Sequence, residues 1–252
     1  MLIYPHRDNL HKIVVLNSKG GCGKSTLATT LASYYALHGA SPTLMDCDQQ
    51  GSSIRWLDLR PKDRPEIHGI AAYKKSMQTT RSWQLRVSQE TTHLIVDSAA
   101  SLGDEELRQL TRDANSILIP VLPSAIDIHA AACCIANLLL VTKIRRQDCQ
   151  LAVIANRTRE NTKSSQTLMR FVSSLSIPLI AELRDTQNYV HAAGQGLGIH
   201  EMPRYKVKKD IEQMSLVLDW LGTWPERRRE AARWRAERSQ KIRLRKALLA
   251  DG

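Results

Sequence analysis

A short segment of this 252-residue chain places two lysines, three hydroxyl side chains and three glycines together, in the order Ser18-Lys19-Gly20-Gly21-Cys22-Gly23-Lys24-Ser25-Thr26. An apolar run at 13–16 precedes it, and a stretch with helical periodicity follows at 27–37. Glycines let successive backbone N–H groups point at an anion, and a helix N-terminus adds unpaired N–H groups and partial positive charge. The segment therefore predicts a phosphate-binding P-loop between a strand and a helix.

Within this loop, each residue type suggests a role toward a nucleoside triphosphate. Lys24 can reach the β- and γ-phosphates, and the Ser25 hydroxyl can ligate Mg²⁺. The remaining cofactor-binding residues are expected to surround the phosphates: Gly20, Gly21, Cys22, Gly23 and Thr26. Ser18 stands where the usual P-loop pattern has its first glycine, and a second lysine, Lys19, follows it.

The run Lys-Gly-Gly-x-Gly-Lys-Ser-Thr resembles the deviant P-loop of the ParA/MinD ATPase family. The resemblance covers roughly residues 12–222, and McdA-type ATPases, which distribute carboxysomes, look most similar. It implies ATP and Mg²⁺ as cofactors, and a homodimer in the ATP state in which Lys19 reaches the partner's nucleotide. It also implies catalytic roles for Lys19, Lys24 and Asp48. A chance glycine-lysine turn is the alternative, and the segments described next argue against it.

Two carboxylates follow the second predicted strand, in Asp46-Cys47-Asp48-Gln49-Gln50-Gly51-Ser52. The C-terminal ends of parallel strands are where an α/β sheet binds its ligand. The segment resembles the family's Asp-x-Asp-Pro-Gln-Gly-Ser switch, with Gln49 in place of proline. The resemblance implies that Asp48 positions the attacking water and that Asp46 lies near the outer shell of the metal. A turn with an Asx-type hydrogen bond is the alternative interpretation.

Further segments extend the resemblance. The apolar strand 93–97 ends in Asp97, as a Walker-B strand does, and predicts a carboxylate that holds the Mg²⁺ hydration shell. Residues 98–103 look like the second switch, with Ala99 and Ala100 where prolines are common. The segment 119–127 resembles a Pro-x-x-Pro-Ser-x-x-Asp stretch, although a turn capped by Ser124 or Asp127 explains it equally well. The resemblance places the adenine against four residues: Asn156, Arg157, Met202 and Pro203.

Buried parallel strands are expected at 12–17, 41–46, 93–97, 116–120, 151–156 and 178–181, with helices at 26–38, 104–114, 128–144 and 164–175. This alternation predicts an α/β fold with a doubly wound, mostly parallel sheet and helices on both faces. Residues 1–222 are expected to form the P-loop ATPase domain.

Residues 223–252 are expected to form a basic C-terminal helix outside that domain. Thr223 fits an N-cap with Glu226 reaching back to it, and the segment 227–249 contains no Gly or Pro. The segment 226–252 holds ten Lys and Arg residues against four Asp and Glu residues, a net charge of +6 out of +11 for the chain. This balance favours a polyanionic partner, either nucleic acid or an anionic membrane, although a solvated helix is the simpler alternative.

Composition narrows the class of protein. Apolar residues make up 42% of the chain, which is enough for a core, and no apolar stretch is long enough to span a bilayer. The N-terminus lacks an apolar signal core, so we expect a cytoplasmic protein associated with the nucleoid. The five cysteines show no metal-binding spacing, which argues against an iron-protein type of ATPase.

The resemblance implies a dimerising ATPase that binds double-stranded DNA without sequence preference. It would position or partition a plasmid, chromosome region or carboxysome-like body with an activator similar to ParB or McdB. The alternative is a MinD-like membrane ATPase anchored by the C-terminal helix. That helix makes a poor apolar stripe, because charged residues at 237–241 separate Trp234 from Leu244 and Leu248.

Overall fold

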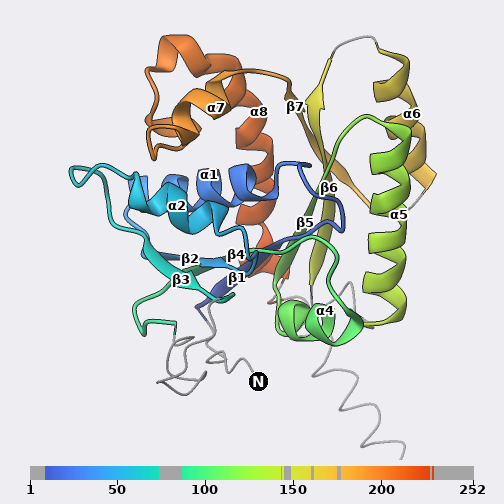
Figure 1. The fold of residues 1–252 in the computed structure, drawn as a ribbon, viewed down its shortest axis with the longest axis horizontal. Coiled ribbons are helices and arrows are strands. Elements are labelled where there is room, and N and C mark those ends of the chain that lie inside the picture. The colour runs from blue at the N-terminus through green and yellow to red at the C-terminus, as the bar shows by residue number, and fades with distance from the viewer. Residues whose placement is uncertain are drawn as a thin grey trace, which may run out of the picture.

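A computed structural model describes residues 9–73, 87–142, 144, 149–159, 162–174, 177–227 and 229. Its centre is a seven-stranded sheet of order β3-β2-β4-β1-β5-β6-β7, in which every neighbouring pair is parallel (Figure 1). The strands are β1 (His11–Val15), β2 (Pro42–Asp46), β3 (His68–Ala71), β4 (His93–Asp97), β5 (Ser116–Val121), β6 (Gln150–Thr158) and β7 (Leu179–Arg184). The predicted parallel sheet is confirmed.

Helices cover both faces of this sheet. They are α1 (Lys24–Leu37), α2 (Ser52–Asp58), α4 (Asp104–Thr111), α5 (Ala125–Leu140), α6 (Lys163–Ser174), α7 (Asn188–Ala193) and α8 (Arg204–Gly222), with a 3₁₀ turn, η1, at Ile199–Glu201. Side chains of alternate strand residues point to opposite faces, so β1 contributes Val14 to one core cluster and Ile13 and Val15 to the other. The doubly wound prediction is therefore confirmed.

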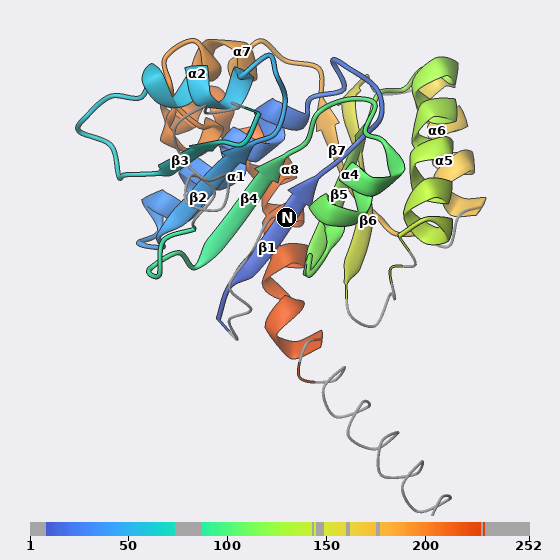
Figure 2. The same cartoon turned by 60° about the horizontal axis from the view of Figure 1, so that its bottom comes forward.

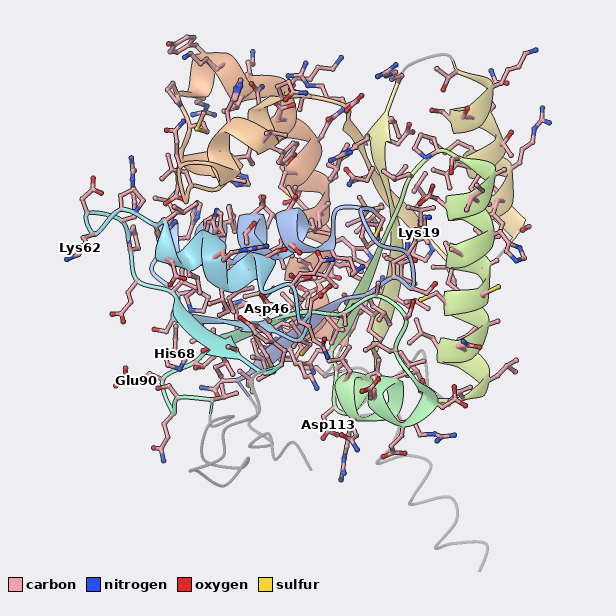
Figure 3. The ribbon with its side chains drawn as sticks, viewed as in Figure 1. Lys19, Asp46, Lys62, His68, Glu90 and Asp113 are labelled. Atoms are coloured by element: carbon pink, nitrogen blue, oxygen red, sulfur yellow. The ribbon has the colours of Figure 1, made fainter. Side chains whose placement is uncertain are left out.

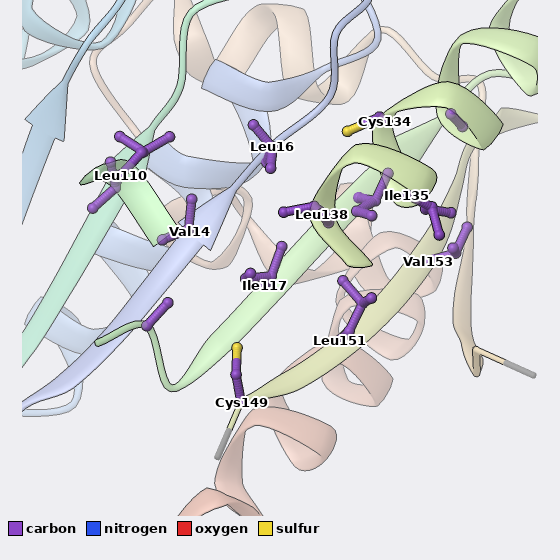
Figure 4. Close-up of a cluster of buried hydrophobic side chains, with 14 of the residues drawn as sticks. Val14, Leu16, Leu110, Ile117, Cys134, Ile135, Leu138, Cys149, Leu151 and Val153 are labelled. Carbon is purple, nitrogen blue, oxygen red and sulfur yellow. The ribbon is translucent and has the colours of Figure 1, made fainter. Parts of the chain in front are cut away.

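The first cluster lies between the sheet and helices α4, α5 and α6. Figure 4 shows Leu138 and Ile135 of α5 above Ile117 of β5 and Leu151 of β6. These side chains are at most 7% exposed. The second cluster, on the opposite face, packs helices α1, α2 and α8 against the same strands. Burial on both faces explains why the strands read as continuous apolar runs.

Four elements were not expected from the sequence: β3, α2, α7 and α8. Strand β3 is a short edge strand in which only Ile70 is buried, so it lacks an apolar run. Helices α2 and α7 have seven and six residues, too few for a helical period to emerge. Helix α4 also ends at Thr111, three residues before its expected end, because Arg112 leaves the helical conformation.

The prediction that Thr223 is an N-cap is wrong. Thr223 has helical dihedrals, φ −77° and ψ −11°, and its hydroxyl donates to the Trp220 carbonyl at 2.8 Å. An N-cap would have extended dihedrals and a side-chain oxygen that accepts from the next turn. Helix α8 therefore ends at Gly222, and helical structure resumes directly after Thr223 (Figure 2). Most of the predicted basic helix, residues 228 and 230–252, lies outside the described residues.

Candidate nucleotide-binding site

The segment between β1 and α1 forms the expected glycine-rich loop. Gly21 and Gly23 have positive φ values of +77° and +100°, which allow the chain to curl back before α1 begins at Lys24. The Lys24 side chain is 6% exposed, and its Nζ donates to the Lys19 carbonyl at 2.9 Å. The ammonium group thus lies inside the loop, where a β- or γ-phosphate oxygen could replace that carbonyl as its acceptor.

Two asparagines fix the loop to the sheet. Asn17 donates through Nδ2 to the Pro120 carbonyl at 2.7 Å and accepts from the Lys19 amide at 3.1 Å. Asn156 donates through Nδ2 to the Cys22 carbonyl at 2.8 Å. Its Oδ1 accepts from the Arg157 amide at 3.0 Å. The loop is therefore held from β5 on one side and from β6 on the other.

Lys19 lies at the start of the loop, and its side chain is half-buried (Figure 3). Its backbone amide and carbonyl are both used inside the loop. Among the described residues, its ammonium group makes no hydrogen bond or ion pair. The ammonium group of Lys19 is therefore available to bind an anion.

Asp46 and Asp97 are register partners at the C-terminal ends of β2 and β4. Asp97 is fully buried: its Oδ2 accepts from the Ser53 hydroxyl at 2.7 Å, and its Oδ1 has no hydrogen-bond partner among the described residues. Burial raises the pKa of Asp97 to about 6, and the hydroxyls of Ser53 and Ser25 oppose that rise. A buried carboxylate that keeps one unsatisfied oxygen and interacts with the Ser25 hydroxyl suits the hydration shell of Mg²⁺.

Asp46 is committed to the backbone. Its Oδ1 accepts from the Asp48 amide at 3.0 Å, and its Oδ2 accepts from the Ser53 and Ile54 amides at 2.9 and 3.1 Å. The last two amides belong to the first turn of α2, which has no side-chain cap of its own. The Asp46 carboxylate therefore stabilises the first turn of α2 by accepting hydrogen bonds from its unpaired amides. A role of Asp46 in binding the metal, through its remaining lone pairs, stays a prediction.

Asp48 follows in a tight turn and is partly exposed. Its Oδ1 accepts from the Gln50 amide at 2.9 Å, and its carbonyl accepts from the Gly51 amide at 2.9 Å. The Asx-type turn of the alternative interpretation is therefore present. It leaves the second carboxylate oxygen, Oδ2, without a hydrogen bond to the described residues, so the turn and a water-positioning role are compatible.

A pocket of about 220 Å³ opens beside the start of α1. Gly23, Thr26 and Leu27 form its side next to the P-loop. The remaining lining comes mainly from the ends of β6 and β7 and from α7: Pro120, Asn156, Arg157, Leu183, Arg184, Thr186, Tyr189, Val190, Ala193 and Met214. A nucleotide with its phosphates in the loop would place its base here.

The four expected adenine residues divide into two pairs. Asn156 and Arg157 line the pocket, but Met202 and Pro203 lie between η1 and α8 and are not among its lining residues. Helix α7 lines this pocket as well, and the contact of Met202 and Pro203 with adenine stays a prediction. Asn156 also has a structural task in the P-loop, which a resemblance could not reveal.

Sequence reasoning missed the contacts that hold α2. Arg60, just after α2, pairs with Glu201 of η1 at 2.8 Å, and the two side chains are 6% and 0% exposed. Glu201 also accepts from the Gly198 amide at 2.8 Å. Gly196 (φ +66°) packs so closely that an added Cβ would lie 2.5 Å from the Arg60 nitrogen. The Gly-x-Gly spacing at 196–198 was the available signal.

The segment after β5 forms the capped turn that was the simpler interpretation of its sequence. Ser124 is the N-cap of α5, and its hydroxyl accepts from the Asp127 amide at 3.1 Å and donates to the Asp127 carboxylate. In the segment after β4, Ser98 is fully buried and its Oγ has no partner among the described residues, while Ser101 has a positive φ of +55°.

Residues 13–199 match the family described as the CobQ/CobB/MinD/ParA nucleotide binding domain. The chain belongs to this family. It is 27% identical to the maintenance of carboxysome distribution protein A of Halothiobacillus neapolitanus, over 75% of this chain and 87% of that protein. It is also 27% identical to the protein ParA of Rhizobium radiobacter, over 48% of this chain and 52% of that protein.

Solved structures agree on the fold. Apo McdA of Cyanothece superposes with a TM-score of 0.63 at 16% identity, covering 83% of this chain and 99% of that one. A putative plasmid partition protein of Borrelia burgdorferi bound to AMPPNP gives a TM-score of 0.64 at 13% identity, covering 83% of this chain and 99% of that one. The family and the P-loop together make the chain a ParA/MinD-type ATP hydrolase with ATP and Mg²⁺ as cofactors.

Within the described part of the chain, no helix combines the length and the apolar character that crossing a bilayer requires.

Proposed function

We propose that this chain is a ParA-type positioning ATPase that dimerises on ATP and then binds double-stranded DNA without sequence preference. An activator on the cargo, similar to ParB or McdB, would stimulate hydrolysis and release the dimer. The relative from Halothiobacillus favours a carboxysome-like cargo over a plasmid or chromosome region. The observation that carries the proposal is Lys19. We place the protein in the cytoplasm, on the nucleoid.

The two lysines of the P-loop differ in their hydrogen bonding, which suggests different roles. The Lys24 ammonium lies inside its own loop, whereas that of Lys19 has no partner among the described residues. A half-buried ammonium gains most from an anion that excludes water, because charge-assisted hydrogen bonds strengthen in such a site. The phosphate of a nucleotide held by a second copy of the chain fits this requirement.

Lys19→Ala should retain nucleotide binding and lose ATP-induced dimerisation. Lys62→Ala is the matched control, because Lys62 is exposed on the connection from α2 to β3 (Figure 3). Light scattering with a slowly hydrolysed ATP analogue gives the mass of each variant. A Lys19→Ala protein that dimerises and hydrolyses ATP like the wild type would remove the assignment.

The proposed catalytic roles concern residues around the same loop. Lys24 and the loop amides would hold the β- and γ-phosphates, and Asp48 would orient the attacking water. Ser25 and Asp97, with Asp46 behind them, would hold Mg²⁺, which neutralises phosphate charge when bound. Asp48→Ala should trap an ATP-bound dimer with turnover reduced about 10²-fold, whereas Lys24→Ala should lose ATP binding. Normal turnover in Asp48→Ala would move the water-positioning role to another residue.

The first turns of α8 supply a basic surface on the core. We call Arg204, Lys206, Lys208 and Lys209 the α8 basic cluster; all four are exposed. No acidic residue lies in the first turn of α8, so the cluster adds positive charge to the positive end of the helix dipole. Tyr205 is 81% exposed beside it, with the Lys206 Nζ 5.7 Å from the ring centroid. An external polyanion would relieve this concentration of charge.

The predicted basic C-terminal helix, residues 223–252, begins at the opposite end of α8. Thirteen residues, 210–222, separate the α8 basic cluster from Thr223, which corresponds to about 20 Å of helix. The two basic regions therefore start at opposite ends of α8, and we expect them to contribute separately to DNA affinity. Each phosphate contact adds about −0.9 to the slope of log affinity against log salt on duplex DNA.

Two variants separate these contributions: truncation of residues 226–252, and Lys206→Gln with Lys208→Gln. Each should flatten the salt slope of ATP-dependent binding to duplex DNA of unrelated sequence, and neither should change ATP affinity. ATP-dependent binding to anionic liposomes without DNA binding, lost when Trp234, Leu244 and Leu248 are made polar, would instead support the MinD-like alternative.

A further inference from the structure

Ser53 contacts both acidic residues on the metal side of the site. Its amide donates to Asp46 Oδ2 at 2.9 Å, and its hydroxyl donates to Asp97 Oδ2 at 2.7 Å. The residue is fully buried at the start of α2. A single residue therefore joins the ends of β2 and β4 to the helix that follows the Asp48 turn, through its backbone amide to β2 and through its hydroxyl to β4.

The hydrogen bond from the Ser53 hydroxyl leaves the two carboxylate oxygens of Asp97 in different environments. Oδ2 is held by Ser53, whereas Oδ1 is buried without a hydrogen-bond partner among the described residues. A carboxylate is planar, so a hydrogen bond that holds one oxygen also fixes the direction in which the other points. Leaving a buried carboxylate oxygen unpaired is unfavourable, and a hydrated cation would satisfy it.

We propose that Ser53 is a positioning residue for Mg²⁺ binding, and that its hydroxyl orients Asp97 so that Oδ1 faces the hydration shell of the cation. The proposal rests on the proposed role of Asp97. Groups that orient a metal-binding side chain in this way commonly affect metal affinity 10- to 100-fold.

A purely structural role is the competing explanation. A buried serine that only stabilises the first turn of α2 would change the melting temperature when replaced, and it would leave the Mg²⁺ requirement unchanged. The two explanations therefore differ in one measurable quantity, the Mg²⁺ concentration that half-saturates nucleotide binding.

The experiment titrates Mg²⁺ into the purified full chain with a fluorescent ATP analogue and measures binding, not turnover. Ser53→Ala should raise the half-saturating Mg²⁺ concentration about 10-fold or more. Ser53→Thr, which keeps the hydroxyl, should restore it. Ser52→Ala is the matched control, because Ser52 lies beside Ser53 in α2 and makes no hydrogen bond to either carboxylate. Melting curves without Mg²⁺ monitor folding.

Asp97→Asn separates failure of this inference from failure of the metal assignment. If Asp97→Asn raises the Mg²⁺ requirement and Ser53→Ala does not, Ser53 has no positioning role and Asp97 keeps its own. If neither variant changes it, the metal assignment of Asp97 fails and the role of Ser53 fails with it. If Ser53→Ala does not fold, Ser53→Cys replaces it, because a thiol keeps a similar shape with a much weaker donor.

Discussion

Replacing Gly23 with alanine tests how strictly the P-loop depends on its backbone. Gly23 has φ +100°, a conformation that residues with a Cβ rarely adopt. A Cβ added there would lie 2.1 Å from Asn156 Nδ2. The same nitrogen donates to the Cys22 carbonyl at 2.8 Å, so the new methyl group would displace the hydrogen bond that holds the loop to β6.

The expected magnitude follows from these two effects. Holding an alanine at this φ costs about 1–3 kcal/mol. Losing the hydrogen bond from Asn156 adds about 1 kcal/mol. If the loop relaxes without nucleotide, ATP binding must restore the strained shape, so an energy of about 2–4 kcal/mol appears as an affinity loss of roughly 30- to 1,000-fold.

Equilibrium binding of a fluorescent ATP analogue measures this loss, and urea unfolding of the nucleotide-free protein checks the fold. Gly20→Ala is the control for unfolding, because a Cβ at Gly20 would meet no atom within 4 Å. Asn156→Ala removes the hydrogen bond alone and should lower ATP affinity less than Gly23→Ala does. Wild-type ATP affinity in Gly23→Ala would refute the assigned loop geometry.

Two further predictions concern stability. Glu201→Ala, which leaves Arg60 buried without its partner, should lower the free energy of unfolding by about 3–5 kcal/mol. Asp185→Ala, which breaks the exposed pair with Arg159, should change it by less than about 1 kcal/mol; equal losses on urea unfolding would contradict the burial argument. Burial lowers the pKa of His93 to about 4, below its ordinary 6.5, so the folded protein takes up this proton less readily than the unfolded chain. Stability should therefore fall as the pH drops from about 6.5 toward 4, and His93→Phe should reduce that fall; an unchanged pH profile would show that His93 does not contribute.

The sequence was sufficient for the sheet and the P-loop because both depend on local patterns. Five of the six expected strands, β1, β2, β4, β5 and β6, are buried over most of their length, so each reads as an apolar run. Helix α8 was not predicted although it has nineteen residues. Its buried apolar residues are interspersed with charged residues in the basic first turns, so they form no clear apolar run: Val207, Met214, Val217 and Leu221. The short edge strand β3 has one buried residue and no comparable pattern.

The parts of the site that were missed depend on contacts between distant segments. Ser53 meets Asp97 across 44 residues, and Arg60 meets Glu201 across 141. Neither serine nor arginine carries a local signal of such a partner. For Asp46, the family resemblance implied a metal role, whereas the three backbone amides that donate to its carboxylate became visible only in the structure.

The measurement that tests the proposed function most directly is binding of the purified chain to plasmid DNA with ATP, with ADP and without nucleotide, in the presence of Mg²⁺. We expect tight, sequence-indifferent and salt-sensitive binding with ATP only, and loss of that binding in Lys19→Ala. Equal DNA binding in all three nucleotide conditions, or none in any of them, would contradict an ATP-gated dimer that positions cargo on the nucleoid.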